Sequence, residues 1–181
     1  MSTPTRRPGA PPARELPAAH VRAATREDLP TVAAIYNAGI AERVATFETE
    51  PRSVGEIASW TSDGRPFIVA EQDGRVVGFA RASAYSDRCV YSGVGEHAVY
   101  VAPSARGSGV GVRLLRELAA ECERQGFYKL TSRVFADNAA SRAAHRRAGF
   151  VEVGIQRRHG RLDGVWKDCV LVELLLGPAT R

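Results

Sequence analysis

The chain has 181 residues, of which 44% are hydrophobic and 25% charged, and this is enough for one globular domain with a substantial core. No apolar run approaches the roughly 20 residues of a membrane-spanning helix, and residues 1–19 lack the apolar core of a secretory signal, so we expect a cytoplasmic protein without a membrane partner. The net charge of +5 reflects an excess of Arg over Lys along the whole chain; we therefore expect no nucleic-acid partner, but a surface suited to anionic small molecules.

The chain begins with residues 1–19, which are rich in Pro, Ala and Arg and are predicted to form a disordered tail. A short strand over residues 20–24 follows. Thr25 and Asp28 then have the spacing of a capping box, with Asp in place of the usual Glu, and they start a helix. The apolar face of that helix holds Leu29, Val32, Tyr36 and Ile40.

The middle of the chain predicts a second short helix, which begins at Ser53, and then a β-hairpin. The two strands of the hairpin span residues 66–71 and 75–84, and the Asp-Gly pair at 73–74 makes the tight turn between them. A polar loop over residues 85–94 leads to the next strand.

The last part of the chain completes the pattern βααβββαβαββ. Its elements are, in order, a strand over 95–101, a helix over 109–125, a strand over 128–134, a helix over 138–148, and strands over 150–156 and 166–176 that flank a basic loop containing Asp163-Gly164. This order predicts a mixed α/β (α+β) layer fold in a single domain over residues 20–177, followed by a short tail over residues 178–181.

Three cysteines lie far apart in the chain, at Cys89, Cys122 and Cys169. An odd number of cysteines without metal-ligand spacing fits neither a disulfide framework nor a zinc site. We therefore expect free thiols, mostly buried, and no metal.

A glycine-rich turn connects the strand over 95–101 to the long helix that follows it. Glycines let the backbone approach a phosphate closely, and the start of a helix offers free N–H groups to an anion. A Rossmann fingerprint would lie in an early βαβ unit, and a P-loop would contain Gly-Lys-Ser/Thr; the chain has neither. The predicted phosphate-binding residues are Arg106, Gly107, Ser108, Gly109, Val110 and Gly111.

A second motif, Asn-Ala-Ala-Ser-Arg-Ala-Ala-His-Arg-Arg-Ala-Gly-Phe, spans residues 138–150. Together with Val-Tyr-Val-x-Pro at 99–103 and the glycine pattern, it resembles the GNAT superfamily of N-acetyltransferases over roughly residues 20–176. The resemblance implies a mixed central sheet of about seven strands with about four helices, splayed where acetyl-CoA, the co-substrate, binds with its pyrophosphate in the glycine-rich turn. It also implies that Val99, Tyr100, Val101, Asn138 and Ser141 contribute to the cofactor site.

Within the superfamily the chain looks like the phosphinothricin-type branch, which includes the arsinothricin and L-amino-acid N-acetyltransferases. The residues that carry this resemblance are 45–51 (Ala-Thr-Phe-Glu-Thr-Glu-Pro), Arg88 and Tyr91 before Val94-Gly95-Glu96, and the segment 163–168. The chain departs from the branch at residues 85–86, where it has Tyr-Ser while phosphinothricin enzymes often have Lys or Trp-Lys. The exact anionic substrate therefore stays open.

Glu96 is the predicted general base. Acetyl transfer to an amine requires the neutral amine, so a group near the thioester must accept the proton, directly or through water. Strand alternation places Glu96 and Tyr100 on one face of the strand and His97 on the other. The resemblance implies that Glu96 is this base, and a solvated carboxylate at the strand end is the alternative.

His145 lies five residues before Phe150, where many relatives have a Tyr that protonates the leaving thiolate and phosphinothricin-type enzymes have His. Asn138, Ser141 and His145 share one helix face. The resemblance implies that His145 donates a proton or a hydrogen bond as the thiolate leaves. A surface histidine among arginines is the alternative.

The substrate would need an anchor for its carboxylate. Arg88 is the first candidate, because guanidinium groups pair with carboxylates and phosphinates in a bidentate manner, and Arg81 on the preceding strand is the second. Tyr91 and Phe47 would shape the pocket wall, although Phe47 is equally suited to the core.

We therefore predict an acetyl-CoA-dependent N-acetyltransferase that acts by direct transfer on the α-amino group of a small amino acid such as phosphinothricin or arsinothricin, an antibiotic-resistance activity. Amino acids of the methionine sulfoximine or methionine type, or a protein N-terminus, are alternative substrates. A non-catalytic acyl-CoA-binding module is the alternative of another class. The resemblance also implies a homodimer.

Overall fold

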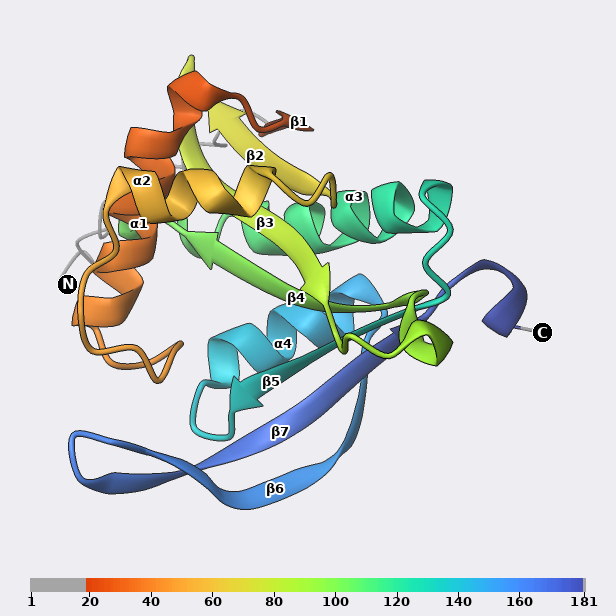
Figure 1. The fold of residues 1–181 in the computed structure, drawn as a ribbon. Helices are drawn as coiled ribbons and strands as arrows, with labels where there is room; N and C mark the ends of the chain where they lie inside the picture. The colour runs from red at the N-terminus through yellow and green to blue at the C-terminus, as the bar shows by residue number, and fades with distance from the viewer. Residues whose placement is uncertain (1–18, 181) are drawn as a thin grey trace, which may run out of the picture.

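The computed structural model describes residues 19–180 (Figure 1). The predicted disordered tail, apart from Ala19, lies outside the described residues, as does Arg181. Among the described residues, the strands are β1 (His20–Ala23), β2 (Phe67–Gln72), β3 (Arg75–Ala84), β4 (Val94–Val101), β5 (Lys129–Phe135), β6 (Val151–Leu162) and β7 (Val165–Leu175). The α-helices are α1 (Leu29–Ala41), α2 (Val54–Ala58), α3 (Val110–Arg124) and α4 (Ala139–Ala148).

The strands form one sheet in the order β1-β2-β3-β4-β5-β7-β6. Neighbouring strands are antiparallel, except for β4 and β5, which are parallel. Helices α1 and α2 cover one face of the sheet, and α3 and α4 cover the other (Figure 1). The predicted mixed α/β fold, with seven strands and four helices, is confirmed.

The two faces of the sheet belong to two separate cores. Val69 and Phe79 pack in the core that includes α1, whereas Ile68 and Ala80 pack in the core that includes α3. Because successive side chains of a strand point to opposite faces, the apolar run in β2 supplies both cores at once. Burial on both faces explains why the sequence of β2 is a continuous apolar run and does not alternate.

The predicted capping box at Thr25 and Asp28 is present. The backbone N–H and the hydroxyl of Thr25 donate to Asp28 Oδ2, at 2.8 and 3.0 Å, and the box opens a short 3-10 turn directly before α1. Asp28 is buried and also pairs with Arg22 at 2.7 Å. The guanidinium of Arg22 lowers the pKa of Asp28 to about 2, so its carboxylate stays ionised.

One prediction for the C-terminal part was wrong. Residues 157–165 do not form a basic loop; instead, β6 and β7 continue as a long hairpin whose turn is only Asp163-Gly164. Both turn residues have positive φ (46° and 82°), the backbone of a tight two-residue hairpin turn. A bulge between Gln156 and Gly160 interrupts the strand register and obscures the alternating pattern in the sequence.

The sheet opens between its two parallel strands. Only Val94–Glu96 of β4 pairs with β5, at Lys129–Thr131, although β4 continues to Val101 and β5 to Phe135. Beyond Glu96 the two strands therefore diverge (Figure 1). The predicted splay is confirmed, and it leaves backbone groups of β4 available on that side.

Candidate active site

A cleft of about 450 Å³ lies where β4 and β5 diverge. It continues into a second hollow of about 370 Å³ that reaches the β6–β7 hairpin at His159. Residues of α1, β3, β4, β5, α4 and the loop after α1 form its walls. The cleft is lined by Tyr36, Ala45, Thr46, Glu48, Arg81, Ser83, Glu96, His97, Ala98, Val99, Tyr100, Ser132, Arg133, Val134, Phe135, Asn138, Ser141 and His145.

Glu96 lies at the last position of β4 that pairs with β5, where the splay begins. Its Oε1 atom pairs with Nη1 of Arg133 at 2.8 Å, and Arg133 also donates from Nε to Gln156 Oε1 at 3.2 Å. Among the described residues, Oε2 of Glu96 has no hydrogen-bond partner. Arg133 therefore fixes the orientation of the carboxylate and leaves one oxygen open to the cleft. Arg133 was not predicted, because no local pattern in the sequence distinguishes it from the many other arginines.

His145 is buried and forms a pair with His97, with 3.0 Å between their Nε2 atoms. Nδ1 of His145 lies 2.8 Å from the carbonyl oxygen of Ser141 and 3.4 Å from its hydroxyl oxygen. Since a carbonyl only accepts, Nδ1 of His145 carries the proton, and Nε2 of neutral His145 accepts from Nε2–H of His97. Burial lowers the pKa of both rings, so the pair is neutral.

The predicted separation of faces along β4 also explains this histidine pair. His97 points to the opposite side of the strand from Glu96 and meets α4, which carries His145. Strand alternation predicted this face for His97 but no role. The signal for a role would have been two histidines that face the same interface. The alternative of a surface position for His145 is wrong.

Tyr100 belongs to an aromatic wall on the α1 side of the cleft. Its ring stacks on Phe79 (centroids 5.3 Å apart) and meets Tyr36 edge-on at 4.8 Å. Gly39 in α1 permits this approach, because a Cβ there would lie 2.9 Å from the Tyr100 ring. Burial raises the pKa of Tyr100, which therefore stays protonated.

Val99 and Val101 present their backbone groups to the open side of β4. Ala102 donates its N–H toward β3, to the carbonyl of Val77 at 2.8 Å. Because backbone groups of successive strand residues point to alternate sides, those of Val99 and Val101 point away from β3, where β5 has diverged. On that side the carbonyl of Val101 accepts from Nε of Arg106 at 3.1 Å. The N–H groups of both valines are therefore placed to bind an extended ligand.

The glycine-rich turn has the backbone that an anion site requires. Gly107 and Gly109 have positive φ (77° and 86°), and nothing lies within 4 Å of the point where a Cβ would stand. Gly109 precedes the first residue of α3, Val110, so the first N–H groups of the helix face this turn. The guanidinium of Arg106, in contrast, pairs with Glu42 at 2.9 Å.

Asn138 and Ser141 border the cleft at the start of α4. The side chain of Asn138 accepts from the Ser141 N–H at 3.0 Å, which caps the helix, and donates to the carbonyl of Val44 at 2.9 Å. Asn138 thereby joins α4 to the loop after α1.

The four predicted substrate-binding residues do not lie together. Arg81 lines the cleft, and Phe47 lines its continuation, packed against Phe135 at 4.8 Å between ring centroids. Arg88 and Tyr91 lie in the loop before β4, where the guanidinium of Arg88 contacts the Tyr91 ring at 5.6 Å and neither borders the cleft. Their role in substrate binding stays a prediction.

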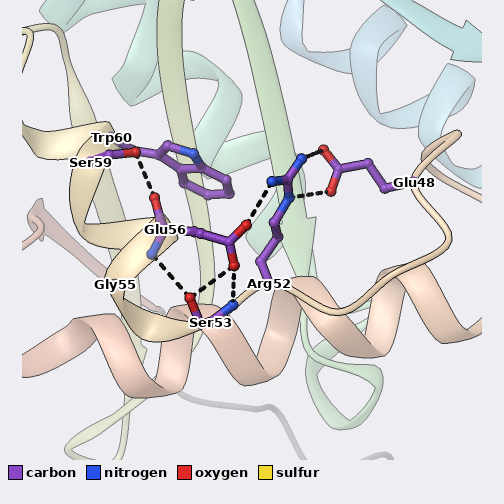
Figure 2. A pocket seen from close by; sticks show the side chains of 7 residues that line it. All are labelled: Glu48, Arg52, Ser53, Gly55, Glu56, Ser59 and Trp60. Atoms are coloured by element: carbon purple, nitrogen blue, oxygen red, sulfur yellow. Dashed lines mark hydrogen bonds and ion pairs between the residues drawn. The ribbon is translucent and has the colours of Figure 1, made fainter.

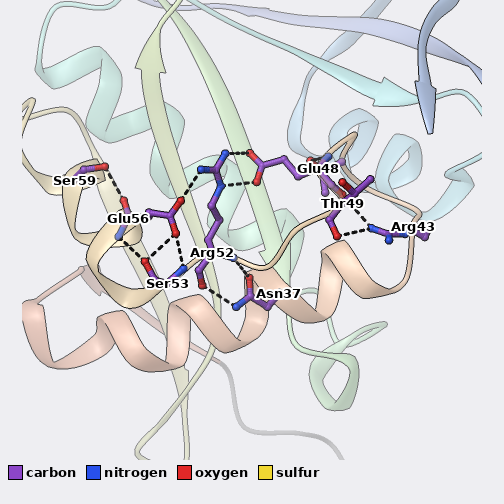
Figure 3. Close-up of polar contacts among 9 residues, drawn as sticks. Asn37, Arg43, Glu48, Thr49, Arg52, Ser53, Glu56 and Ser59 are labelled. Carbon is purple, nitrogen blue, oxygen red and sulfur yellow. Dashed lines mark hydrogen bonds and ion pairs between the residues drawn. The ribbon is translucent and has the colours of Figure 1, made fainter. Parts of the chain in front are cut away.

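The loop between α1 and α2 is fastened to both helices. Asn37 of α1 donates to the carbonyl of Arg52 at 2.9 Å and accepts from its N–H at 2.8 Å. The guanidinium of Arg52 then holds Glu48 through two hydrogen bonds, at 2.7 and 3.0 Å, and pairs with Glu56 of α2 at 2.8 Å (Figure 3). Glu48 thus reaches the wall of the cleft already paired.

A pocket of about 530 Å³ is lined by members of this network and shares Glu48 with the cleft (Figure 2). Glu56 accepts from the N–H and the hydroxyl of Ser53, both at 2.8 Å, which forms a capping box for α2. Polar groups of the pocket wall are therefore engaged with one another, and through Arg52 they hold Glu48 in place.

No group of three or more potential metal ligands occurs among the described residues. Cys122 and Cys169 are buried and Cys89 is exposed, all three as free thiols. Within the described part of the chain, no helix is long and apolar enough to cross a membrane.

Comparison with known proteins places these features in a family. Residues 32–150 match the Acetyltransferase (GNAT) family. The chain is 37% identical over 158 residues to a phosphinothricin N-acetyltransferase of Alcaligenes faecalis, covering 84% of this chain and 80% of that protein. It is 33% identical over 165 residues to an L-methionine sulfoximine/L-methionine sulfone acetyltransferase of Pseudomonas paraeruginosa, covering 88% and 96%.

A crystal structure of a GNAT superfamily phosphinothricin acetyltransferase from Sinorhizobium meliloti, in complex with AcCoA, superimposes with a TM-score of 0.84. The two chains are 35% identical, and the match covers 90% of each.

Proposed function

Because the chain belongs to the acetyltransferase (GNAT) family, we propose that it uses acetyl-CoA to acetylate the α-amino group of a small amino acid. The single observation that carries this proposal is the position of Glu96, a carboxylate with one free oxygen at the point where the sheet opens. A proton-accepting group at this point is what the attack of an amine requires.

The residues around the splay fit acetyl-CoA. The open space beside Gly107 and Gly109 would admit a pyrophosphate close to the backbone, at the positive end of α3. The N–H groups of Val99 and Val101 are free to pair with the pantetheine arm, and Ser108, Val110 and Gly111 continue the phosphate turn into the helix. Acetyl-CoA, when bound, supplies the acetyl group as a thioester.

In this proposal Glu96 accepts the proton of the substrate ammonium group at Oε2, while Arg133 holds Oε1. Backbone N–H groups next to Tyr100 donate to the carbonyl oxygen that becomes negative during attack. His145 assists the departure of the thiolate. Nδ1–H of His145 donates to the Ser141 carbonyl, and Nδ1 lies 3.4 Å from the Ser141 hydroxyl, so the ring of His145 would act through this hydroxyl, which borders the cleft.

The relatives guide the choice of amino acid. One is named for phosphinothricin and the other for methionine sulfoximine and methionine sulfone, and all three compounds are α-amino acids. We propose substrates of this kind, with arsinothricin as a further member. Acetylation would remove the positive charge of their α-amino group.

We also propose that the protein is a cytoplasmic homodimer. An edge strand with apolar side chains exposed to solvent supports the dimer: Val151, Val153 and Ile155 of β6 are each more than half exposed.

The test of the proposed function is release of free CoA thiol from acetyl-CoA with phosphinothricin, arsinothricin, methionine sulfoximine and methionine, with a peptide N-terminus for comparison. The proposal expects turnover of at least one free amino acid, with the acetyl group located on its α-nitrogen by mass spectrometry. Turnover of the peptide alone would contradict it.

A further inference from the structure

The cleft contains one cation that no other group among the described residues neutralises. The two carboxylates that line the cleft are already paired, Glu48 with Arg52 and Glu96 with Arg133. The histidine pair is neutral, because burial lowers the pKa of both rings. Arg81 is the remaining charged residue of the lining, and in the described part of the chain it forms no ion pair.

The surroundings of Arg81 hold it in place without satisfying its hydrogen bonds. Its guanidinium carbon lies 4.6 Å from the centroid of the Trp60 ring, a cation–π contact. Nε of Arg81 is buried and has no hydrogen-bond partner. Asp63, whose charge reaches Arg81, is already paired with Arg65 at 2.8 Å. Burial lowers the pKa of Arg81, yet guanidinium groups stay protonated in proteins.

Arg81 is half-buried, and its buried Nε has no hydrogen-bond partner. A partly desolvated cation without a counter-ion is costly to the folded protein, and it is therefore a signal for an anionic ligand. The planar guanidinium offers parallel N–H groups that match the two oxygens of a carboxylate. The contact with Trp60 is made at the guanidinium carbon, whereas the N–H groups of a guanidinium lie along the edges of its plane. Arg81 is thus prepared for a bidentate anion.

The strand register places Arg81 at a suitable distance from the proposed base. Arg81 of β3 is opposite Ala98 of β4, and Ser83 is opposite Glu96. Arg81 and Glu96 are therefore diagonal neighbours on one face of the sheet, a relation that separates Cβ atoms by about 7–8 Å. An α-amino acid, whose amine and carboxylate are attached to the same carbon, can bridge two such side chains.

We propose that Arg81 binds the α-carboxylate of the amino-acid substrate and so makes the site selective for free amino acids over peptide N-termini. The identity of the ligand as an amino acid rests on the proposed function. The presence of an anion site at Arg81 does not depend on it. It assigns the anchor to Arg81 on β3 and not to Arg88, the first candidate from the sequence, which lies outside the cleft.

The experiment has a binding arm that does not depend on turnover. Propionate, titrated at constant ionic strength, should raise the Tm of the wild-type protein to a plateau, and propionamide should not. Arg81→Gln should abolish the response to propionate, whereas the matched variant Arg88→Gln should keep it. An unchanged response in Arg81→Gln would overturn the proposal. Arg81→Gln should fold normally, because it removes a half-buried charge that has no ion-pair partner among the described residues.

The kinetic arm compares the best amino acid of the panel with its carboxamide. Arg81→Gln should lower kcat/KM for the acid about 100-fold, mainly through KM, as expected for truncating one partner of a buried charge pair. The carboxamide should lose less than about threefold, since it has no carboxylate to lose. Equal losses for both substrates would show general damage and contradict the assignment.

The two arms distinguish the proposals. If the wild type acetylates no amino acid but its response to propionate depends on Arg81, the anion site stands and the proposed function fails. If the wild type acetylates amino acids and Arg81→Gln does so equally well, the proposed function stands and the anchor fails.

Discussion

The Nε2 atoms of His97 and His145 lie 3.0 Å apart in the interior, and the ring of His145 is anchored on its other side by the carbonyl of Ser141. Two histidines can share a short N···N contact only when one ring donates and the other accepts. The pair therefore joins β4 to α4 beneath the cleft as a neutral unit. Protonation of either ring would require either a repulsive contact or a buried charge.

The first prediction concerns the pH dependence of stability. The unfolded histidines have a pKa near 6.5, and burial lowers it for both in the folded protein. Below about pH 6.5 the unfolded chain then binds more protons, so stability is full above this value and falls as the pH decreases. The slope is up to about 1.4 kcal/mol per pH unit for each histidine, and urea unfolding between pH 8 and pH 5 measures it.

The matched variants separate this effect from other titrations. His97→Gln, which keeps an N–H donor for His145, should reduce the slope, whereas His20→Gln at an exposed position should not. Asp28 has a lowered pKa of about 2, and its contribution is lost at lower pH, between about pH 4 and pH 2. An equal slope in the wild type and His97→Gln would contradict the buried neutral pair.

The second prediction concerns the glycine-rich turn. Gly109→Ala should raise the Kd for acetyl-CoA about tenfold or more, because φ of 86° strains an L-residue and a methyl group would enter the space left for the phosphate. Gly64→Ala is the control, since Gly64 has φ of 68° and similarly open surroundings but lies outside the cleft. Equal Kd values for the two variants, measured by calorimetry, would remove the turn from the cofactor site.

The third prediction tests the fastening of the loop that carries Glu48. Asn37→Ala removes both hydrogen bonds to the Arg52 backbone, which should cost about 2 kcal/mol and lower the Tm by about 6 °C. It should also raise KM for the amine, because the loop forms one wall of the cleft. Asn37→Asp keeps the acceptor and should give an intermediate Tm. Identical Tm values for Asn37→Ala and the wild type would show that the loop is held elsewhere.

The fourth prediction tests the exposed apolar strand. Ile155→Lys places a charge on β6, at a side chain that is 62% exposed in the single chain, and should convert a dimer to a monomer in light scattering after size-exclusion chromatography. Ser59→Lys, at an exposed position that begins the 3-10 turn Ser59–Thr61, is the control. A wild-type protein that runs as a monomer would contradict the proposed dimer.

Local patterns were sufficient for most of the fold. The capping box at Thr25, the Asp-Gly turn at residues 73–74 and the glycine-rich start of α3 each depend on neighbours in the sequence, and all were predicted. The outer half of the β6–β7 hairpin was missed because Arg157, Arg158 and His159 read as a basic loop. β6 is mostly exposed, and a bulge at Arg158 (φ 50°) shifts its alternation.

The candidate site was predictable only in part. Glu96 and His145 could be found because each belongs to a motif along the chain. The partners that orient them, Arg133 and His97, are defined by contacts across 37 and 48 residues of sequence, which no local pattern encodes. The same holds for Arg81, whose significance depends on the absence of a partner among the described residues.

The most direct test of the account is the kinetics of Glu96→Gln with acetyl-CoA and the best amino acid of the panel. Glutamine keeps the size and the contact with Arg133 but cannot accept the amine proton. The account predicts that kcat falls at least about 100-fold, with the Kd for acetyl-CoA unchanged by calorimetry. Turnover of Glu96→Gln at the wild-type rate would contradict the assignment of Glu96 as the base.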